Sequence, residues 1–274
     1  MKSLPSPLVL ALTIAFCSNS WAIESGEAPT FTANGSLKVC TAGEFPPMEF
    51  YANPGDTEMV GFEVDVINAL AKKWNVKPTL VVGDFKSLLP SLDSQRCDLV
   101  ISGISITKDR LKRYDGVAYF KTSVVMVTSA KNSDIKQPED LSGKLVALEA
   151  GTTYESIAGQ LNEKLIAQGK KPVAIQTYPS ASAVIQQVLV GRAAATITQD
   201  TTAAYRSSQL PGQLSIPYSY GDANYFGIYM RQSAGDKSQV QQAISQMQQS
   251  GEFGALLTKW NLPSDSTDFK VADQ

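Results

Sequence analysis

Short apolar segments alternate with amphipathic helical segments along most of this chain, and this alternation is the feature that most constrains its fold. In one clear helical segment Val66, Leu70 and Trp74 share a face at the 3.6-residue period. The apolar segments 37–41 and 79–82 are predicted strands before and after that helix. Strands that alternate with helices predict mostly parallel sheets with flanking helices, which is an α/β fold.

The strand–helix rhythm runs twice, around a break that we place near residues 120–128. The elements expected after the break are strands at 144–148, 173–177, 195–198 and 226–230, and helices at 154–168, 181–190 and 237–249. A length of 274 residues is consistent with two domains. Residues 23–35 are expected to form a flexible leader, and residues 264–274 a frayed end.

Residues 1–22 are predicted to be a secretory signal peptide, so the mature protein is expected to be exported. Lys2 supplies positive charge, an apolar run covers 8–17, and Ser-Trp-Ala at 20–22 resembles a cleavage site. The apolar run is too short to span a bilayer as a helix. The alternatives are an uncleaved anchor and a lipoprotein acylated at Cys17, which the bulky phenylalanine before that cysteine disfavours.

Composition excludes several function classes. The chain has no histidine, which removes Ser-His and Cys-His catalysis and His-bearing zinc sites. Its three cysteines cannot complete an all-cysteine zinc site, so we expect no metal and no cofactor. A net charge of −2 argues against nucleic-acid binding. Cys40 and Cys97 remain after cleavage, and their spacing leaves both a disulfide and two free thiols open.

Three loops that follow predicted strands carry groups suited to a ligand. In open α/β sheets, ligands bind at the carboxyl ends of strands, where helix N-termini present free N–H groups. The loop at 102–107 leads to Arg110, whose guanidinium can bind a carboxylate through two parallel hydrogen bonds. A second loop supplies Thr152 and Thr153, and Asp200 in the third can hold an ammonium group. Together these groups predict a site for a zwitterion.

Each of these residues also has a plainer interpretation. Arg110 lies among other basic residues and fits a solvated surface, while Asp200 fits a helix cap. Phe45 and Phe85 lie in loops on the presumed ligand edge, where two rings can flank a ligand side chain. The same two rings fit the hydrophobic core equally well.

Eight segments, taken in order, match the pattern of a known family. They are TAGEFPPM at 41–48, GFEVDV at 61–66, LLPSL at 88–92, SGISITKDR at 102–110, DLSGK at 140–144, GTT at 151–153, GRAAATITQD at 191–200 and KW at 259–260. In this ordered set the chain resembles the periplasmic polar amino-acid-binding proteins of ABC importers, solute-binding family 3. The resemblance covers about residues 37–262.

The resemblance implies two α/β lobes, each a mostly parallel sheet flanked by helices, joined by two hinge crossings. The first lobe would be discontinuous, comprising 36–122 and 222–262, and the second would comprise 123–221. The ligand would lie in the cleft between them. The protein would capture an amino acid by hinge closure, with no bond made or broken, and deliver it as a monomer to a membrane permease.

The resemblance also implies a role for each candidate residue. At the carboxylate end, Arg110 would bind the ligand α-carboxylate with help from Ser105 and Thr152, and Thr153 belongs to the same loop.

At the other end, Asp200 would bind the α-ammonium group with help from Ser102 and Gly103. Phe45 and Phe85 would flank the ligand side chain.

One departure from the family pattern bears on the ligand. Members for basic amino acids carry an acid where this chain has Ala42, so we expect a neutral polar ligand. Glu44 lies nearby but is shifted by two residues in a loop. Gln199 and Tyr154 are expected near the far end of the ligand side chain.

Two other function classes stay open. The same two-lobe fold carries cyclohexadienyl and arogenate dehydratases, which need a general acid in the cleft. Glu44, Glu149 and Glu155 are the candidates for that acid, although none follows Asp200 where one is expected. A receptor sensing domain would need a membrane-spanning helix and a signalling domain, and the sequence predicts neither.

Overall fold

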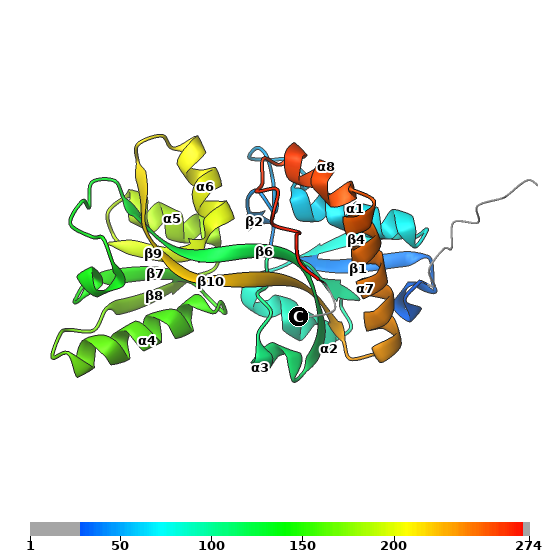
Figure 1. Ribbon diagram of the computed structural model, residues 1–274, viewed down its shortest axis with the longest axis horizontal. Coiled ribbons are helices and arrows are strands. Elements are labelled where there is room, and N and C mark those ends of the chain that lie inside the picture. Colours follow the sequence, from blue (N-terminus) through cyan, green and yellow to red (C-terminus); the bar gives the residue numbers. More distant parts are fainter. Residues whose placement is uncertain (1–27, 271–274) are drawn as a thin grey trace, which may run out of the picture.

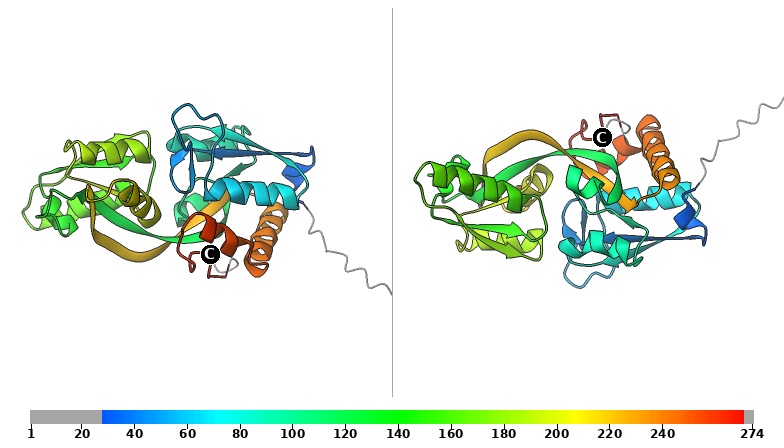
Figure 2. Two further views of the ribbon diagram at one scale, coloured as in Figure 1. Left: turned by 90° about the horizontal axis from the view of Figure 1, so that it is seen from above. Right: turned by 90° about the horizontal axis from the view of Figure 1, so that it is seen from below.

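Two lobes share one sheet of eight strands in the computed structural model, which describes residues 28–270. The predicted signal peptide lies outside these residues. Figure 1 shows two long strands, β6 (Tyr114–Ser129) and β10 (Leu214–Arg231), running side by side from one group of helices to the other. The views in Figure 2 show the same arrangement. The fold is therefore the two-lobe α/β architecture expected from the sequence.

The first lobe contains the N-terminal half and the C-terminal helices. Its elements are β1 (Ser36–Thr41), β2 (Glu44–Phe45), β3 (Glu49–Phe50), α1 (Phe62–Lys73), β4 (Lys77–Val82), α2 (Leu88–Asp93), β5 (Leu99–Val100), α3 (Lys108–Leu111), α7 (Ala234–Gln249) and α8 (Glu252–Lys259). Short 3₁₀ turns lie at Thr30–Thr32 and Phe85–Ser87.

The second lobe is built from the middle of the chain. Its elements are β7 (Leu145–Glu149), α4 (Tyr154–Ala167), β8 (Ala174–Tyr178), α5 (Ala181–Leu189), β9 (Ala195–Gln199) and α6 (Asp200–Gln209), after a 3₁₀ turn at Pro138–Leu141. The strand order of the whole sheet is β4-β1-β5-β10-β6-β9-β7-β8. Pairing is parallel within each lobe, and it is antiparallel where β6 and β10 meet each other and their neighbours.

Hydrophobic periodicity accounts for α1, whose predicted inward face at Val66 and Leu70 is fully buried. The helix ends at Lys73, well before Pro78. Pro78 lies inside β4, which is tolerated because β4 is an edge strand.

The strand–helix rhythm is interrupted near 120–128, where β6 runs from the first lobe to the second as one continuous strand. Most of its residues are buried on both faces, so its burial does not alternate as that of a half-buried strand does. The predicted lobe boundaries at 122–123 and 221–222 fall inside β6 and β10, so they stay a prediction.

The C-terminal segment is packed rather than frayed as far as residue 270. The backbone N–H of Lys121 donates a hydrogen bond to the carbonyl of Ser266 at 2.6 Å. The rings of Phe269 and Tyr225 meet edge to face at 5.0 Å between centroids. These contacts lay the segment across β6 and β10, against the expectation from its polar sequence.

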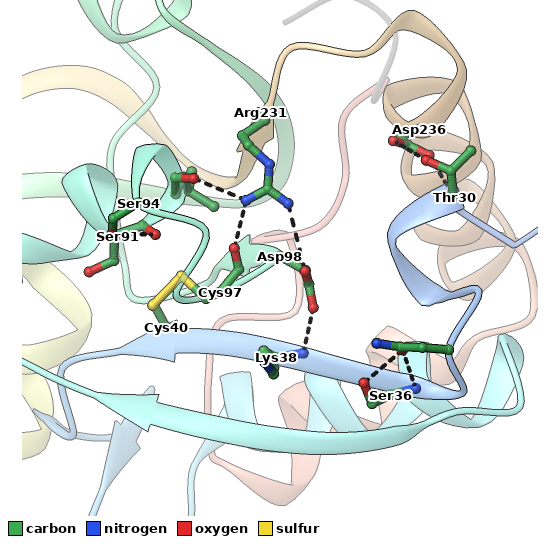
Figure 3. A network of polar contacts seen from close by, with 12 residues as sticks. Thr30, Ser36, Lys38, Cys40, Ser91, Ser94, Cys97, Asp98, Arg231 and Asp236 are labelled. Atoms are coloured by element: carbon green, nitrogen blue, oxygen red, sulfur yellow. Dashed lines mark hydrogen bonds and ion pairs between the residues drawn. A yellow bond between two sulfur atoms is a disulfide. The ribbon is translucent and has the colours of Figure 1, made fainter.

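A network of hydrogen bonds joins the segment from the end of β10 to the start of α7 to N-terminal parts of the first lobe (Figure 3). Arg231, the last residue of β10, donates to the carbonyl oxygens of Leu92 at 3.0 Å and Cys97 at 2.8 Å. Asp236 at the start of α7 accepts hydrogen bonds from the backbone N–H and the hydroxyl of Thr30. Residues far apart in sequence thus complete one lobe, and the expected leader is partly ordered.

A disulfide joins Cys40 in β1 to Cys97 before β5, with a Cα–Cα distance of 5.7 Å (Figure 3). The two cysteines are fully buried, and the spacing is ordinary for a disulfide. The structure therefore selects the paired state that the sequence left open. Among the described helices, none is both long and apolar enough to span a membrane.

Candidate ligand-binding site

A small cavity lies between the lobes, with a free volume of only about 10 Å³. Its lining comes from the ends of strands and the starts of helices in both lobes: Phe45, Phe85, Gly103, Ser105, Arg110, Glu149, Thr152, Thr153 and Tyr154. Seven of the nine residues proposed from the sequence are in this lining. The exceptions are Ser102 and Asp200.

Arg110 reaches both sides of the cavity from the short helix α3. Thr107 caps that helix, because its hydroxyl accepts from the Arg110 backbone N–H at 3.2 Å. The guanidinium donates to the carbonyl of Ser105 at 2.8 Å and to the carbonyl of Gly151 in the other lobe at 3.2 Å. Burial lowers the pKa of Arg110 from its ordinary value, yet arginine stays charged at neutral pH. A positive group thus faces the cavity.

Gly103 lies directly against the ring of Phe45. Its φ is +55°, and a Cβ there would come 2.5 Å from Cε1 of that ring. Only glycine satisfies both conditions, the left-handed backbone and the close approach. The Phe45 ring is itself held edge to face against Phe226, with centroids 6.0 Å apart. One face of the cavity is therefore fixed by packing.

Two fully buried carboxyl groups support the loop at 102–103 from behind. Ser102 donates from its hydroxyl to Glu49 at 2.6 Å and accepts from the backbone N–H of Ala42 at 3.0 Å. The N–H of Gly103 donates to Glu63 at 2.8 Å, and the Tyr119 hydroxyl donates to the same Glu63 oxygen. Ser102 therefore lies in the second layer and positions the loop.

Glu49 and Glu63 lie against each other in the core, and their pKa values are raised. Burial is the main cause for both, and for Glu49 the charge of Glu63 adds to it. Two carboxylates side by side in a dry interior cannot both ionise, so the pair holds a proton at neutral pH. Glu49 carries it, because Glu63 already accepts hydrogen bonds from two donors.

The second lobe contributes the loop after β7. The hydroxyl of Thr152 donates to the backbone carbonyl of Glu149 at 2.7 Å, which shapes the turn before α4. Gly151 has a φ of +81°, and a Cβ there would lie 2.7 Å from Cβ of Lys86 in the first lobe. The lobes are therefore in close contact beside the cavity.

Asp200 lies on an adjoining groove, which also includes Pro47, Tyr205 and Trp260. Its carboxylate accepts from the hydroxyl of Thr122 at 2.5 Å and from the backbone N–H of Thr201 at 2.7 Å. The structure thus does not bring Asp200 to the cavity that contains Arg110.

Glu149 is the lining residue whose place in the site the sequence did not predict. It was considered only as a candidate acid for an enzyme, although its position as the last residue of a strand before Gly-Thr-Thr was a usable signal. Tyr154 lines the cavity as expected. Gln199 does not, because it is buried beneath it with its side-chain oxygen 3.3 Å from the Thr122 hydroxyl.

Comparison with known proteins agrees with this architecture. The L-cystine-binding protein TcyJ of Escherichia coli (strain K12) is 29% identical over 262 residues, covering 94% of each chain. A solved structure of an ancestral arginine-binding protein bound to arginine is 29% identical, with a TM-score of 0.76, covering 82% of this chain and 98% of that one.

The ancestral amino acid-binding protein AncCDT-1, a precursor of cyclohexadienyl dehydratase, is also similar. It is 28% identical, with a TM-score of 0.74, covering 83% of this chain and 96% of that one. Residues 37–263 match the family described as bacterial extracellular solute-binding proteins, family 3. This match spans both lobes and the cavity between them, so the chain belongs to the family 3 bacterial extracellular solute-binding proteins.

Proposed function

We propose that this protein captures an amino acid in the cavity between its lobes and delivers it to the permease of an ABC importer. The observation that carries the proposal is the Arg110 guanidinium, which faces a cavity with the Ser105 and Thr152 side chains around it. A guanidinium held among hydroxyl groups suits an α-carboxylate. The similar proteins named above bind cystine and arginine, which are both amino acids.

The proposed mechanism is hinge closure along β6 and β10. The lobes touch through Arg110 and Gly151 and through the hydroxyl of Ser182, which donates to the carbonyl of Glu44 at 3.3 Å. A ligand held by groups from both lobes binds the closed form better and so shifts the population toward it. The permease would recognise that closed surface. We propose that the protein acts as a monomer in the periplasm, after removal of residues 1–22.

Asp200 is the proposed partner of the ligand ammonium group, aided by the loop at 102–103. It stands at the start of α6, and its carboxylate uses Thr122 and Thr201 as hydrogen-bond donors in the closed form. We further propose a ligand with a neutral polar side chain, because Ala42 supplies no countercharge at the position where members for basic amino acids carry an acid.

One observation favours a second candidate function. The carboxyl of Glu149 lines the cavity, and burial raises its pKa to about 8. An acid with this pKa is suited to donate a proton at neutral pH. Together with the likeness to a precursor of cyclohexadienyl dehydratase, this makes a dehydratase acting on prephenate or arogenate the alternative.

A thermal-unfolding screen of the purified protein separates these functions. The ligands are the twenty amino acids, cystine, prephenate and arogenate. A ligand present at 100 times its Kd stabilises the folded state by about 2.7 kcal/mol, which raises Tm measurably. The binding function predicts a rise with an amino acid that disappears in Arg110→Ala. Consumption of prephenate with no response to any amino acid would overturn it in favour of the enzyme.

A further inference from the structure

Glu149 is a buried carboxyl group in the cavity that no part of the proposed mechanism uses. It ends β7, and its side chain lines the same space as Phe45, Phe85 and Arg110. Only 5% of the residue is exposed. Because Phe45, Phe85 and Arg110 come from the first lobe and Glu149 from the second, the carboxyl lies where the two lobes meet.

The surroundings of Glu149 leave its charge uncompensated. Glu44 faces it from β2 and Tyr154 from α4, and the negative charge of Glu44 adds to the effect of burial on its pKa. The backbone N–H of Ala181, at the start of α5, donates a hydrogen bond to the carboxyl group and thereby lowers the pKa of Glu149. Within the described residues Glu149 forms no ion pair, and the Arg110 guanidinium donates to two carbonyl groups instead.

The backbone N–H of Ala181 meets only part of the hydrogen-bonding capacity of this carboxyl group, and the ligand is the further partner that the cavity allows. An apolar ligand side chain would leave the rest of that capacity unsatisfied, which is costly in a dry site. An acidic side chain would be repelled when Glu149 is ionised. A side chain that ends in N–H groups satisfies the oxygens of Glu149 directly.

We propose that Glu149 determines specificity, by accepting hydrogen bonds from a nitrogen group at the far end of the ligand side chain. The inference rests on the proposed amino-acid-binding function and adds the chemistry of the ligand side chain to it. The neutral polar side chain proposed above corresponds to an amide, and a cationic guanidinium or ammonium group is the alternative that the test compares with it. An amide leaves the proton on Glu149, whereas a cation pairs with the carboxylate and displaces the proton into solvent.

Titration calorimetry of the wild-type protein and Glu149→Gln tests this with five ligands. Arginine and its neutral isostere citrulline compare the two nitrogen groups, glutamine supplies a shorter amide, and leucine and methionine supply none. We expect the best nitrogen-bearing ligand to bind the wild type at least tenfold more tightly than leucine or methionine. Glu149→Gln should reduce that preference at least tenfold. Repeating the titration in buffers of different ionisation enthalpy identifies proton release, expected for arginine and not for citrulline.

Two further variants keep the test informative. Glu163→Gln changes an exposed glutamate of α4 and should bind like the wild type. Glu149→Leu removes the carboxyl altogether and should shift the preference toward leucine. Thermal unfolding of each variant without ligand shows that it is folded.

The outcomes distinguish the inference from the function on which it rests. Tight binding of leucine or methionine to the wild type, or an unchanged order of affinities in Glu149→Gln and Glu149→Leu, overturns the role of Glu149 while amino-acid binding stands. Failure of the wild type to bind any of the twenty amino acids or cystine overturns the proposed function and this inference together.

Discussion

The Arg110 guanidinium donates a hydrogen bond across the cavity to the carbonyl oxygen of Gly151, at 3.2 Å. The two residues belong to different lobes and lie 41 positions apart in the sequence. Arg110 thus contributes to contact between the lobes, and it is also the group proposed to hold the ligand carboxylate. Ligand binding and closure therefore share one side chain.

Arg110→Ala should weaken binding of the amino-acid ligand by at least about 100-fold, because hydrogen bonds to charged groups contribute about 1.5–3 kcal/mol each. Titration calorimetry measures the change. Lys112→Ala is the matched control, since this lysine of the same segment forms an exposed ion pair with Asp109. Exposed pairs contribute little, so the control should bind normally. Equal affinity of Arg110→Ala and the wild type would contradict the proposed clamp.

Gly151→Ala should impair closure and weaken ligand binding about tenfold or more. The added Cβ would lie 2.7 Å from Cβ of Lys86, a contact made only when the lobes approach. Small-angle X-ray scattering with saturating ligand should show a larger radius of gyration than for the wild type. Gly169→Ala shares the unfavourable positive φ, +69°, but meets nothing within 4 Å. It should lose stability without losing closure, and similar scattering from both variants would refute the steric account.

The stability of the ligand-free protein should fall as the pH rises from about 4.5 to 8. Burial raises the pKa of Glu149 to about 8 and also raises the pKa values of Glu49 and Glu63. In this range the folded state binds more protons than the unfolded chain, so raising the pH favours unfolding. Denaturant unfolding at pH 5 and pH 8 measures the slope. Glu49→Gln, which keeps a neutral group in the pair, should flatten it, and an unchanged slope would argue against a shared proton there.

Removing the disulfide should destabilise the protein without changing its ligand affinity. Cys40 and Cys97 are 57 residues apart, and a loop of this size predicts a loss of about 4 kcal/mol. The Cys40→Ala/Cys97→Ala variant should therefore unfold at a clearly lower temperature in a calorimetric scan. Addition of a reductant should lower the Tm of the wild type and leave that of the variant unchanged. A stable variant with lost binding would show that the bond shapes the site.

Local sequence patterns predicted the elements whose stability is largely local. The periodicity of α1 could be identified because it depends on residues a few positions apart, and the threonine cap of α3 and the short helix at Pro138–Leu141 are local in the same sense. The continuous β6 and the packed segment around Ser266 could not, because each depends on partners far away in the chain. A strand that is buried on both faces lacks the alternation of apolar and polar residues by which a half-buried strand is recognised in a sequence.

The residues of the site also fall into two groups, those predictable from nearby sequence and those whose position depends on distant parts of the chain. Arg110, Ser105 and Thr152 were predictable, since the ends of parallel strands converge on one edge of a sheet. The burial of Glu149 was not, because it depends on the second lobe lying against Phe45 and Phe85 in the first. The role of Asp200 stays a prediction, because this residue at the end of a strand lies on the neighbouring groove and not in the lining of the cavity.

The position of β10 sets the order in which the molecule can be completed. It is the last strand in the chain, yet it lies between β5 and β6 in the sheet. A chain that emerges from its N-terminus can pair β6 with β9 and finish the second lobe, while β5 still has an open edge. Folding of the first lobe is complete only after Arg231 has been synthesised and donates its hydrogen bonds to the carbonyl oxygens of Leu92 and Cys97. Nearly the whole chain must therefore be synthesised before its N-terminal half is folded, and until then that half exposes an unpaired edge to chaperones.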